Sequence, residues 1–321
     1  MDTEFDLISR YFRRAAPAGM LGVGDDCALL APRTGWQMAT STDLLIEGTH
    51  FLAEDDPGSL GHKALAVNIS DLAAMGAEPL ACLLGLSLPR IDHTWLAAFT
   101  EGFHCLAQRA RCPLIGGDTT RSPAGLVISV TVLGQVPAGQ ALLRSAARPE
   151  DDIWVTGLLG AADVALQLRL GKLPANPDLL AATRDALDRP DPPWSFAPAL
   201  AGLAHAALDI SDGLLQDLGH ILEASHCGAR LDYARMPIHP AVSRSGLDPD
   251  VIQRAVLAGG DVYQLCFTAP SEARDEIQAC ARRADVLATR VGVIREAPGL
   301  HVIDAEGQAV SLPAGGFDHF S

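Results

Sequence analysis

The sequence lacks the cysteine and histidine spacings that mark a disulfide framework or a zinc site. Its seven cysteines are odd in number and form no CxxC pair, and its ten histidines show neither HxH nor HExxH. Scattered cysteines of this kind are typical of small buried hydrophobic residues in a reducing compartment. We therefore expect neither disulfide bonds nor bound zinc.

The sequence also has no membrane-spanning run and no signal peptide. No apolar stretch approaches the roughly 20 residues that cross a bilayer. The N-terminal segment MDTEFDLISRYF carries acids where a signal peptide carries bases. These absences predict a soluble, cytoplasmic protein that does not act in a membrane.

Positive charge is scarce, since 24 Lys and Arg residues face 39 Asp and Glu residues and the net charge is −15. Such a balance disfavours binding to nucleic acid or to an anionic membrane surface. It is compatible with cation binding, but many soluble proteins are acidic without binding metal. Charge alone therefore does not select a function.

The familiar nucleotide-binding motifs are missing as well. There is no GxxxxGK(S/T) loop, no HRD and DFG pair, and no GxGxxG after a strand. If this protein binds ATP, carboxylates must hold the phosphates through metal ions, because no P-loop lysine is available.

What the sequence does contain is a series of aspartates in short motifs flanked by glycine or hydroxyl residues. Acid in apolar or small-residue surroundings is costly unless it is paired, hydrogen-bonded or bound to a cation. Hard divalent metals on carboxylates most often serve phosphate chemistry, so the series predicts such a site. The motifs are Asp26 in GVGDDCALL, Asp43 in ATSTDLLIEG, Asp71 in AVNISDLAAMG, Asp118 in LIGGDTTRSP, and Asp209 with Asp212 in ALDISDGLLQDLG.

Most of these motifs also have a purely structural explanation. The segment 24–26 is compatible with a plain turn, and the segment 41–43 with a helix N-cap. Asp71 is harder to explain in this way, because at helical spacing it shares a partly apolar stripe with Val67 and Met75. We favour a liganded carboxylate at Asp71.

Two further motifs suit a phosphate group. In the segment 116–121, paired glycines allow a close backbone approach and Arg121 offers a guanidinium, although a glycine turn is an equal alternative. In the segment 209–213, a strand runs into a helix that Ser211 or Asp212 can cap, and helix N-termini bind anions. His50 and Arg144, taken alone, are explained as a packed histidine and a surface charge.

Strand-like and helical segments alternate along the chain, which predicts a mixed α+β protein in two halves. The segment 137–152, PAGQALLRSAARPEDD, has no apolar period, so we place the domain boundary there and expect domains at 1–140 and 141–321. The expected strands are 36–42, 80–88, 126–136, 153–156, 206–210, 263–268 and two near Val291 and Val302; the expected helices are 62–75, 93–109, 161–170, 178–187, 196–205, 214–224 and 272–283.

The order and wording of the motifs resemble the thiamine-monophosphate kinase family of the aminoimidazole ribonucleotide synthetase-like superfamily. The resemblance implies an N-terminal dimerising sheet domain and a C-terminal α/β sandwich. It also implies ATP-dependent phosphorylation of thiamine monophosphate to thiamine diphosphate with several Mg²⁺ ions, and a homodimer whose N-terminal domains pair through β-sheet. The matching segments are GVGDDCALL, STDLLIEGTHF, GHKALAVNISDLAAMGAEP, LIGGDTTRSP, LLRSAARPEDDIWVTG, LDISDGLLQDLGHI and GFDHF.

The resemblance also implies roles for individual residues. No catalytic acid or base is among them, since a phosphate monoester with a second pKa near 6 is already an anionic nucleophile at neutral pH. The roles are metal binding by Asp26, Ser41, Thr42, Asp43, Asp71, Asp118, Asp209 and Asp212; ATP binding by Gly117, Asp118, Arg144 and Ser211; and substrate binding by His50, Asp261 and Phe317.

One segment departs from the family pattern. Residues 259–265 are GGDVYQL where the family usually has GGEDYEL, so Asp261 is one methylene shorter and Val262 and Gln264 replace acids. Two alternatives therefore stay open: another ATP-dependent enzyme of the superfamily, or a non-catalytic nucleotide or thiamine-phosphate binder. Independently of the resemblance, the β-branched segment 126–136 would expose a flat strand edge in a monomer, which favours a dimer.

Overall fold

The computed structural model of the protein describes residues 4–24 and 27–311. The chain forms two compact units, the first made of Met1–Leu72 and Ala77–Gly139, the second of Ala73–Gly76 and Gln140–Ser321. Each unit combines helices and strands, so the expected α+β class is confirmed. Within the described residues no helix is long and apolar enough to span a bilayer.

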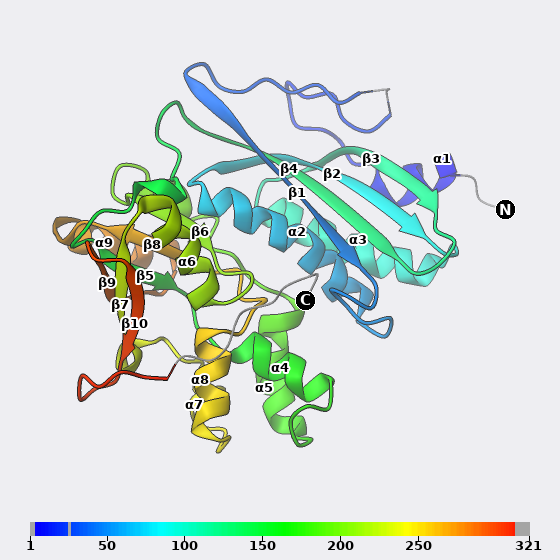
Figure 1. Ribbon diagram of the computed structural model, residues 1–321. Helices are drawn as coiled ribbons and strands as arrows, with labels where there is room; N and C mark the ends of the chain where they lie inside the picture. The colour runs from blue at the N-terminus through cyan, green and yellow to red at the C-terminus, as the bar shows by residue number, and fades with distance from the viewer. Residues whose placement is uncertain (1–3, 25–26, 312–321) are drawn as a thin grey trace. The chain divides into compact units, whose positions relative to one another are not determined.

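The first unit is built on a four-stranded sheet in the order β1-β4-β2-β3. β4 pairs antiparallel with both neighbours, and β2 pairs parallel with β3. Helices α2 (Pro57–Ala74) and α3 (His93–Arg109) lie along one side of this sheet (Figure 1). The strands are β1 (Trp36–Ile46), β2 (Glu78–Leu88), β3 (Leu114–Arg121) and β4 (Val127–Pro137); the short helices α1 (Glu4–Leu7) and η1 (Ile8–Phe12) precede them.

Strand alternation explains how the sheet presents its residues. Ile128, Val130 and Val132 of β4 are fully buried, while the residues between them are only partly buried. Successive side chains of a strand point to opposite faces, so one face packs on the helices and the other stays open. On β1 the open face carries Met38, Leu44 and Ile46, all at least 40% exposed.

The strand edge lies elsewhere than the sequence suggested. β4, which contains most of the expected 126–136 segment, is bonded on both sides, to β1 and to β2. The free edges of this sheet are β1 and β3. The β-branched run is therefore a central strand, consistent with the preference of Val and Ile for buried strands, and the argument for an exposed edge applies to β1 instead.

The second unit contains a six-stranded sheet in the order β10-β7-β9-β5-β8-β6. Only β10 and β7 pair in parallel; the other neighbours are antiparallel. The strands are β5 (Asp152–Thr156), β6 (Ala206–Asp209), β7 (Gly228–Asp232), β8 (Leu265–Ala269), β9 (Ala288–Arg295) and β10 (Gly299–Ile303).

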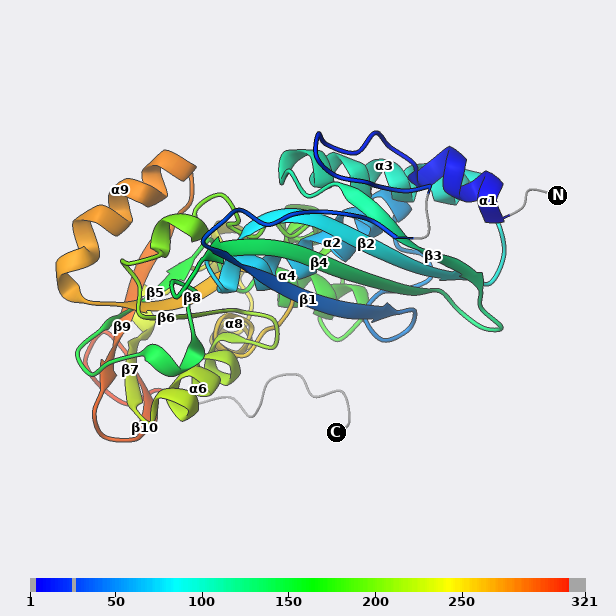
Figure 2. The same ribbon diagram turned by 90° about the horizontal axis from the view of Figure 1, so that it is seen from above.

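Helices α6 (Leu214–Ser225) and α9 (Arg274–Ala284) cover opposite faces of this sheet (Figure 2). All of β5 is buried: Ile153 and Val155 join the apolar cluster that includes α6, whereas Trp154 joins the cluster that includes α9. A strand buried on both faces is the centre of a sandwich. The expected C-terminal α/β sandwich is thus confirmed.

Four more helices of the second unit pack together beside the sheet. Ala161, Val164, Leu179, Val242 and Ala255 form their shared apolar cluster. The helices are α4 (Ala161–Arg169), α5 (Pro177–Asp188), α7 (Pro240–Ser243) and α8 (Pro249–Leu257); the short 3-10 helices are η2 (Arg144–Ala146), η3 (Ala197–Leu200), η4 (Tyr233–Arg235) and η5 (Ser271–Ala273).

The local differences from expectation have physical causes. The helix expected over 196–205 is wrong, since only η3 forms there and Gly202 turns the chain with a φ of +78°. β7, α7 and α8 were not expected. α8 nevertheless carries a start signal, because Asp248 accepts the N–H of Asp250 and Pro249 is the first helical residue.

Candidate functional site

The first unit brings a carboxylate pair together between β1 and α2. Ser41 Oγ donates a hydrogen bond of 2.6 Å to Asp71 Oδ2. The Asp43 N–H, on the same strand, donates to Asn68 Oδ1 at 3.0 Å. Because Ser41 and Asp43 are two residues apart on a strand, both side chains leave from the face that meets α2.

This arrangement concentrates negative charge. Burial, and after it the neighbouring Asp71 carboxylate, raise the pKa of Asp43 to about 6 from 3.8. A carboxylate raised by burial and by a like charge is one that a cation would stabilise. Carboxylate and hydroxyl oxygens are the donors that Mg²⁺ prefers, so Ser41, Asp43 and Asp71 fit such an ion.

Thr42 does not join this group. Its hydroxyl donates to the Val130 carbonyl at 3.1 Å and accepts from Thr131 Oγ1 at 3.0 Å. Strand alternation places it on the open face, away from Ser41 and Asp43. One ion therefore cannot bind all three side chains. The N-cap alternative is also excluded, since these residues lie within β1.

Gly117 and Asp118 lie in strand β3 and not in a glycine turn. A cross-strand row runs from Asp43 through Val130 and Leu84 to Gly117. Three strand spacings of about 4.8 Å put Gly117 roughly 14 Å from Asp43. Asp118 belongs to the next row and is exposed, so the structure does not bring its carboxylate to the Asp43 and Asp71 pair.

His50 lies in the turn that follows β1. Its Nδ1 accepts the N–H of Ile46 at 3.0 Å. A ring nitrogen that accepts carries no proton, so the neutral imidazole holds its proton on Nε2. His50 thus offers an Nε2–H donor, the form that suits a phosphate oxygen.

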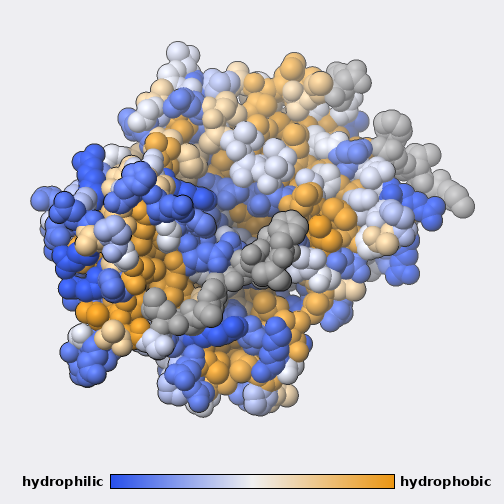
Figure 3. Space-filling view, viewed as in Figure 1, coloured by the Kyte–Doolittle hydropathy of each residue, from blue (hydrophilic) through white to orange (hydrophobic). Residues whose placement is uncertain are grey.

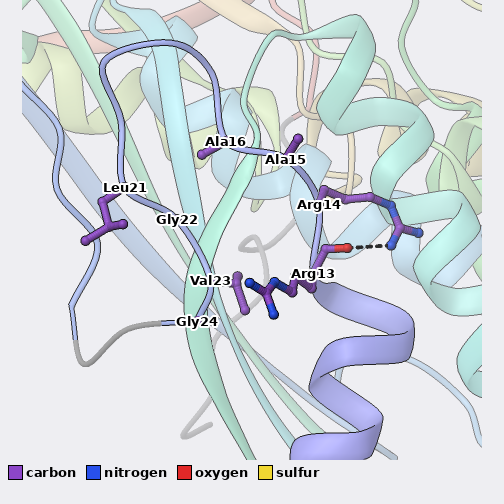
Figure 4. A pocket seen from close by; sticks show the side chains of 8 residues that line it. All are labelled: Arg13, Arg14, Ala15, Ala16, Leu21, Gly22, Val23 and Gly24. Carbon is purple, nitrogen blue, oxygen red and sulfur yellow. Dashed lines mark hydrogen bonds between the residues drawn. The ribbon is translucent and has the colours of Figure 1, made fainter.

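Asp26 and Phe317 lie outside the described residues. A pocket of about 370 Å³ lies on the chain just before Asp26. It is lined by residues 13–16 and 21–24, and Figure 4 shows the Arg13 side chain toward Val23 and Gly24 and the Arg14 side chain pointing away from them. Arg14 Nη1 donates to the Arg13 carbonyl at 2.9 Å.

In the second unit, a buried carboxylate organises the turn between β6 and α6. Asp217, 4% exposed, accepts the N–H groups of Ser211, Asp212 and Gly213 on one oxygen, each at 3.0 Å. Gly213 is the N-cap residue and has no side chain to offer. The expected capping by Ser211 or Asp212 does not occur, and the amides expected to meet a phosphate already bind Asp217.

Burial, and after it the Asp212 carboxylate, raise the pKa of Asp217 to about 7, although the three N–H donors lower it. Asp217 was not predicted from the sequence as a site residue. The sequence does indicate that its carboxylate is buried, because Asp217 shares a helical stripe with the buried Leu214, Leu218 and Ile221. An acid on an apolar stripe needs partners, as was recognised for Asp71.

The segment 261–263 closes over the same turn. The Asp261 N–H donates to the Ser211 carbonyl at 2.8 Å, and the Tyr263 N–H donates to the Ile210 carbonyl at 2.7 Å. A Cβ on Gly260 would lie 2.6 Å from the Ser211 oxygen, so glycine is required there. The structure thus brings Asp261, expected to bind substrate, beside Ser211, expected to bind ATP.

The two residues that replace family acids have structural partners. Val262 packs against the apolar cluster of the second unit. Gln264 Oε1 accepts from Thr156 Oγ1 at 2.9 Å, and Gln264 Nε2 donates to the Asp191 carbonyl at 2.9 Å. The departure from the family pattern is therefore accommodated by packing and hydrogen bonds.

Asp209 and Arg144 lie at different places on the second unit. Asp209 ends β6 and is 8% exposed. Arg144 is exposed, and its carbonyl accepts from Ser225 Oγ at 2.8 Å, at the far end of α6. A twelve-residue helix is about 18 Å long, so the structure does not bring Arg144 to the Ser211 turn.

In the described part of the chain no three His, Cys, Asp or Glu side chains lie close enough together to hold a metal ion. In these described residues the carboxylates of interest therefore occur in pairs. Asp43 with Asp71 is the pair in the first unit, and Asp209 and Asp212 flank one turn in the second.

Known proteins match the whole chain. The AIR synthase related protein family matches with its N-terminal domain at residues 24–136 and its C-terminal domain at residues 148–305. The thiamine-monophosphate kinase of Escherichia coli K12 is 44% identical, covering 99% of this chain and 98% of the relative. That of Bacillus subtilis 168 is 35% identical and covers 99% of both.

Solved structures agree. The thiamine-monophosphate kinase of Stenotrophomonas maltophilia K279a has a TM-score of 0.83 and 46% identity, covering 91% of this chain and 93% of that one. AaThiL complexed with AMPPCP and TMP has a TM-score of 0.78 and 28% identity, with coverages of 90% and 89%. The chain therefore belongs to the AIR synthase related protein family and, within it, to the thiamine-monophosphate kinases.

Proposed function

We infer that this protein transfers a phosphoryl group from ATP to thiamine monophosphate and so forms thiamine diphosphate. The observation that carries the inference is the 44% identity to a thiamine-monophosphate kinase over 99% of the chain. The complex of AaThiL with AMPPCP and TMP supports both substrates. The altered 259–265 segment does not favour a non-catalytic binder, because Val262 and Gln264 have partners of their own.

We propose that several Mg²⁺ ions bind this protein. Such ions neutralise the charge that develops between donor and acceptor phosphates. The raised pKa of Asp43 beside Asp71 supports a cation at that pair. The full proposed ligand set, divided among several ions so that Thr42 serves a different ion from Ser41 and Asp43, is Asp26, Ser41, Thr42, Asp43, Asp71, Asp118, Asp209 and Asp212.

The remaining roles are binding and orientation. The acceptor phosphate is already anionic at neutral pH, so we assign no general base. His50 would donate its Nε2–H to a phosphate oxygen, and Asp261 would attract the thiazolium cation. Gly117, Asp118, Arg144 and the Ser211 hydroxyl would contact ATP, and Phe317 would contact thiamine phosphate.

We propose that residues 1–140 form the metal-binding, ATP-binding and dimerising domain, and that residues 141–321 complete the nucleotide and substrate site. The free edge of β1 and its exposed Met38, Leu44 and Ile46 support a homodimer through the first unit. Figure 3 shows apolar surface over the region of that unit's sheet. We also propose a cytoplasmic location, since all seven cysteines are free.

The decisive experiment incubates the purified protein with MgATP and thiamine monophosphate and measures thiamine diphosphate by chromatography. We expect product formation that depends on both substrates and is abolished by EDTA. Absence of product above background, despite measurable ATP binding, would refute the kinase. Thiamine and aminoimidazole ribonucleotide precursors serve as control acceptors, and a preference for one of them would indicate a different enzyme of the superfamily.

A further inference from the structure

The turn between β6 and α6 is held by a carboxylate that the proposed function does not use. Asp217 lies in the first turn of α6, and its Oδ2 accepts three consecutive amides, those of Ser211, Asp212 and Gly213. Gly213 is the N-cap residue of α6, and Ser211 and Asp212 precede it, so only the Gly213 amide belongs to the helix start. A residue from within the helix therefore binds two amides of the preceding turn as well as the N-cap amide.

Other helix starts in this protein are capped in the ordinary way. Asp92, which precedes α3, accepts the amides of Thr94 and Trp95. Asn176 and Asp248 likewise precede their helices and accept one amide each. Asp217 differs because the chain before the helix folds back over its carboxylate. Its contacts fix the shape of the turn and not only the end of the helix.

The turn is also held from its other side. The carbonyls of Ile210 and Ser211 accept the amides of Tyr263 and Asp261. The Ile210 amide donates to the Gln264 carbonyl at 2.7 Å. Because these amides and carbonyls already have partners, a ligand would meet the turn through the side chains of Ser211 and Asp212. The Asp212 carboxylate also accepts from Gln216 Nε2 at 3.2 Å.

The position of a charged group here is costly, which argues for a role beyond packing. Asp217 is 4% exposed and lies near the Asp212 carboxylate. A neutral Asn would fill the same volume without placing two like charges together. The carboxylate brings three charge-assisted hydrogen bonds to one short segment, which orient backbone more strictly than neutral ones.

We propose that Asp217 is a positioning residue, which orients Ser211 and Asp212 toward Mg²⁺ and nucleotide and occupies the amides of residues 211–213 so that no phosphate oxygen binds those amides. The proposal rests on the proposed function for the identity of the ligands. Groups that orient metal ligands typically contribute 10- to 100-fold to metal affinity. The effect should therefore appear in metal binding before it appears in folding.

The test compares Asp217→Asn and Asp217→Ala with the wild type and with Asp92→Asn, a matched cap variant in the first unit. Mn²⁺ affinity is measured by calorimetry on the full chain without substrate, and the melting temperature is measured in parallel. We expect Asp217→Asn to stay folded and lose roughly 10-fold in Mn²⁺ affinity, with Asp217→Ala losing more. Asp92→Asn should leave Mn²⁺ affinity unchanged and alter the melting temperature little, because Asn caps a helix about as well as Asp.

A second measurement tests whether Asp217 keeps phosphate away from the amides of residues 211–213. Inorganic phosphate should protect Asp217→Ala against thermal unfolding and leave the wild type unchanged, because only the variant has free amides there. If Asp217→Ala does not fold, the Mn²⁺ affinity of Asp217→Asn alone tests the proposal. Mn²⁺ affinity of Asp217→Asn within about twofold of wild type would overturn the proposal. Since Mn²⁺ binding needs no turnover, a failure of the kinase assay would be recognised separately.

Discussion

At the scale of single residues, the partly buried Asp43 predicts how the metal-free protein responds to pH. Its pKa is about 6 when folded and 3.8 when free. The folded state therefore holds a proton that the unfolded state has released, and the contribution of Asp43 to stability falls as pH rises from about 4 to 6. The difference of 6 − 3.8 = 2.2 units corresponds to at most about 3 kcal/mol.

Urea unfolding in EDTA at several pH values measures this dependence. In Asp43→Asn the decrease in the free energy of unfolding between about pH 4 and 6 that is due to this residue should vanish. In the wild type, Mg²⁺ should restore the stability lost in this range. A wild-type stability that rises steadily across the same pH range, with no change in Asp43→Asn, would contradict the assignment.

Asp71 is the second residue at which the site can be tested. Because Asp71 accepts the Ser41 hydroxyl and lies beside Asp43, Asp71→Asn should remove a metal ligand without opening a cavity. We expect turnover to fall by on the order of 100-fold or more, with an unchanged circular dichroism spectrum. Ser41→Ala, which keeps both carboxylates, serves as the control and should lose less. A near wild-type rate for Asp71→Asn at saturating Mg²⁺ would exclude the role.

Asp261 combines an unusual backbone with a charge. Its φ is +58°, and its Oδ1 accepts from the Tyr263 hydroxyl at 3.2 Å. Asn tolerates this left-handed region, whereas Ala is disfavoured there by about 1 kcal/mol. Asp261→Asn should therefore raise the KM for thiamine monophosphate several-fold without loss of stability. Asp261→Ala should raise this KM and also lower the stability. Steady-state kinetics and thermal unfolding separate the two effects, and an unchanged KM in Asp261→Asn would argue against a charge contact.

Single residues were easiest to select from the sequence where a charged side chain interrupts an apolar pattern. Asp71 was identified because an acid on an apolar helical stripe has to be satisfied. Thr42 was grouped with Ser41 and Asp43 through the family resemblance, and strand alternation places its side chain on the opposite face from theirs. Asp217 was overlooked because it lies inside a helix, where no capping rule places an acceptor.

At the scale of elements, Gln264 ties three segments together. It bonds Thr156 at the end of β5 and the Asp191 carbonyl, and it stands directly before β8. Gln264→Glu would set a carboxylate oxygen against that carbonyl, where the amide now donates. We expect a loss of about 1–3 kcal/mol in the free energy of unfolding at neutral pH, measured in urea. Gln264→Met, which keeps the shape, should lose less; a Gln264→Glu variant as stable as wild type would disprove the bond.

Elements were predictable where periodicity and a start signal coincide. α3 forms over His93–Arg109 as expected, and its start at Asp92 is a capped one. α8 was missed although Asp248 and Pro249 mark its beginning. β3 was taken as a possible turn because glycines signal turns, yet a strand also needs glycine where Gly117 meets the Leu84 carbonyl.

At the scale of the whole molecule, the open edge of β1 predicts self-association. Leu44 is 56% exposed on this strand, so Leu44→Lys would place a charge in the proposed interface. We expect light scattering to report a dimer for the wild type and a shift toward monomer for Leu44→Lys. Leu170→Lys, at an exposed leucine of the second unit, is the control and should remain dimeric. A monomeric wild type at micromolar concentration would refute the dimer.

The two-part organisation was visible in the sequence because a non-periodic, proline-containing stretch interrupts the alternation of elements. The family motifs predicted both units, since they occur in order along nearly the whole chain. Strand order was not predictable in the same way. β4 became a central strand and β1 an edge through pairings between residues about 90 positions apart, for which single segments carry no signal.

The binding of the amides of residues 211–213 by Asp217 has a consequence for the order in which ligands bind. In many nucleotide sites free backbone amides bind the phosphate, and a nucleotide without its metal ion can bind first. In the turn at Ser211–Gly213 those amides already face the protein's own anion, and the neighbouring side chains are acids. If ATP binds at this turn as proposed, a triphosphate without a cation would be repelled there, so we expect the cation to bind first or together with the nucleotide. Uncomplexed ATP should then be a poor competitor, however abundant it is.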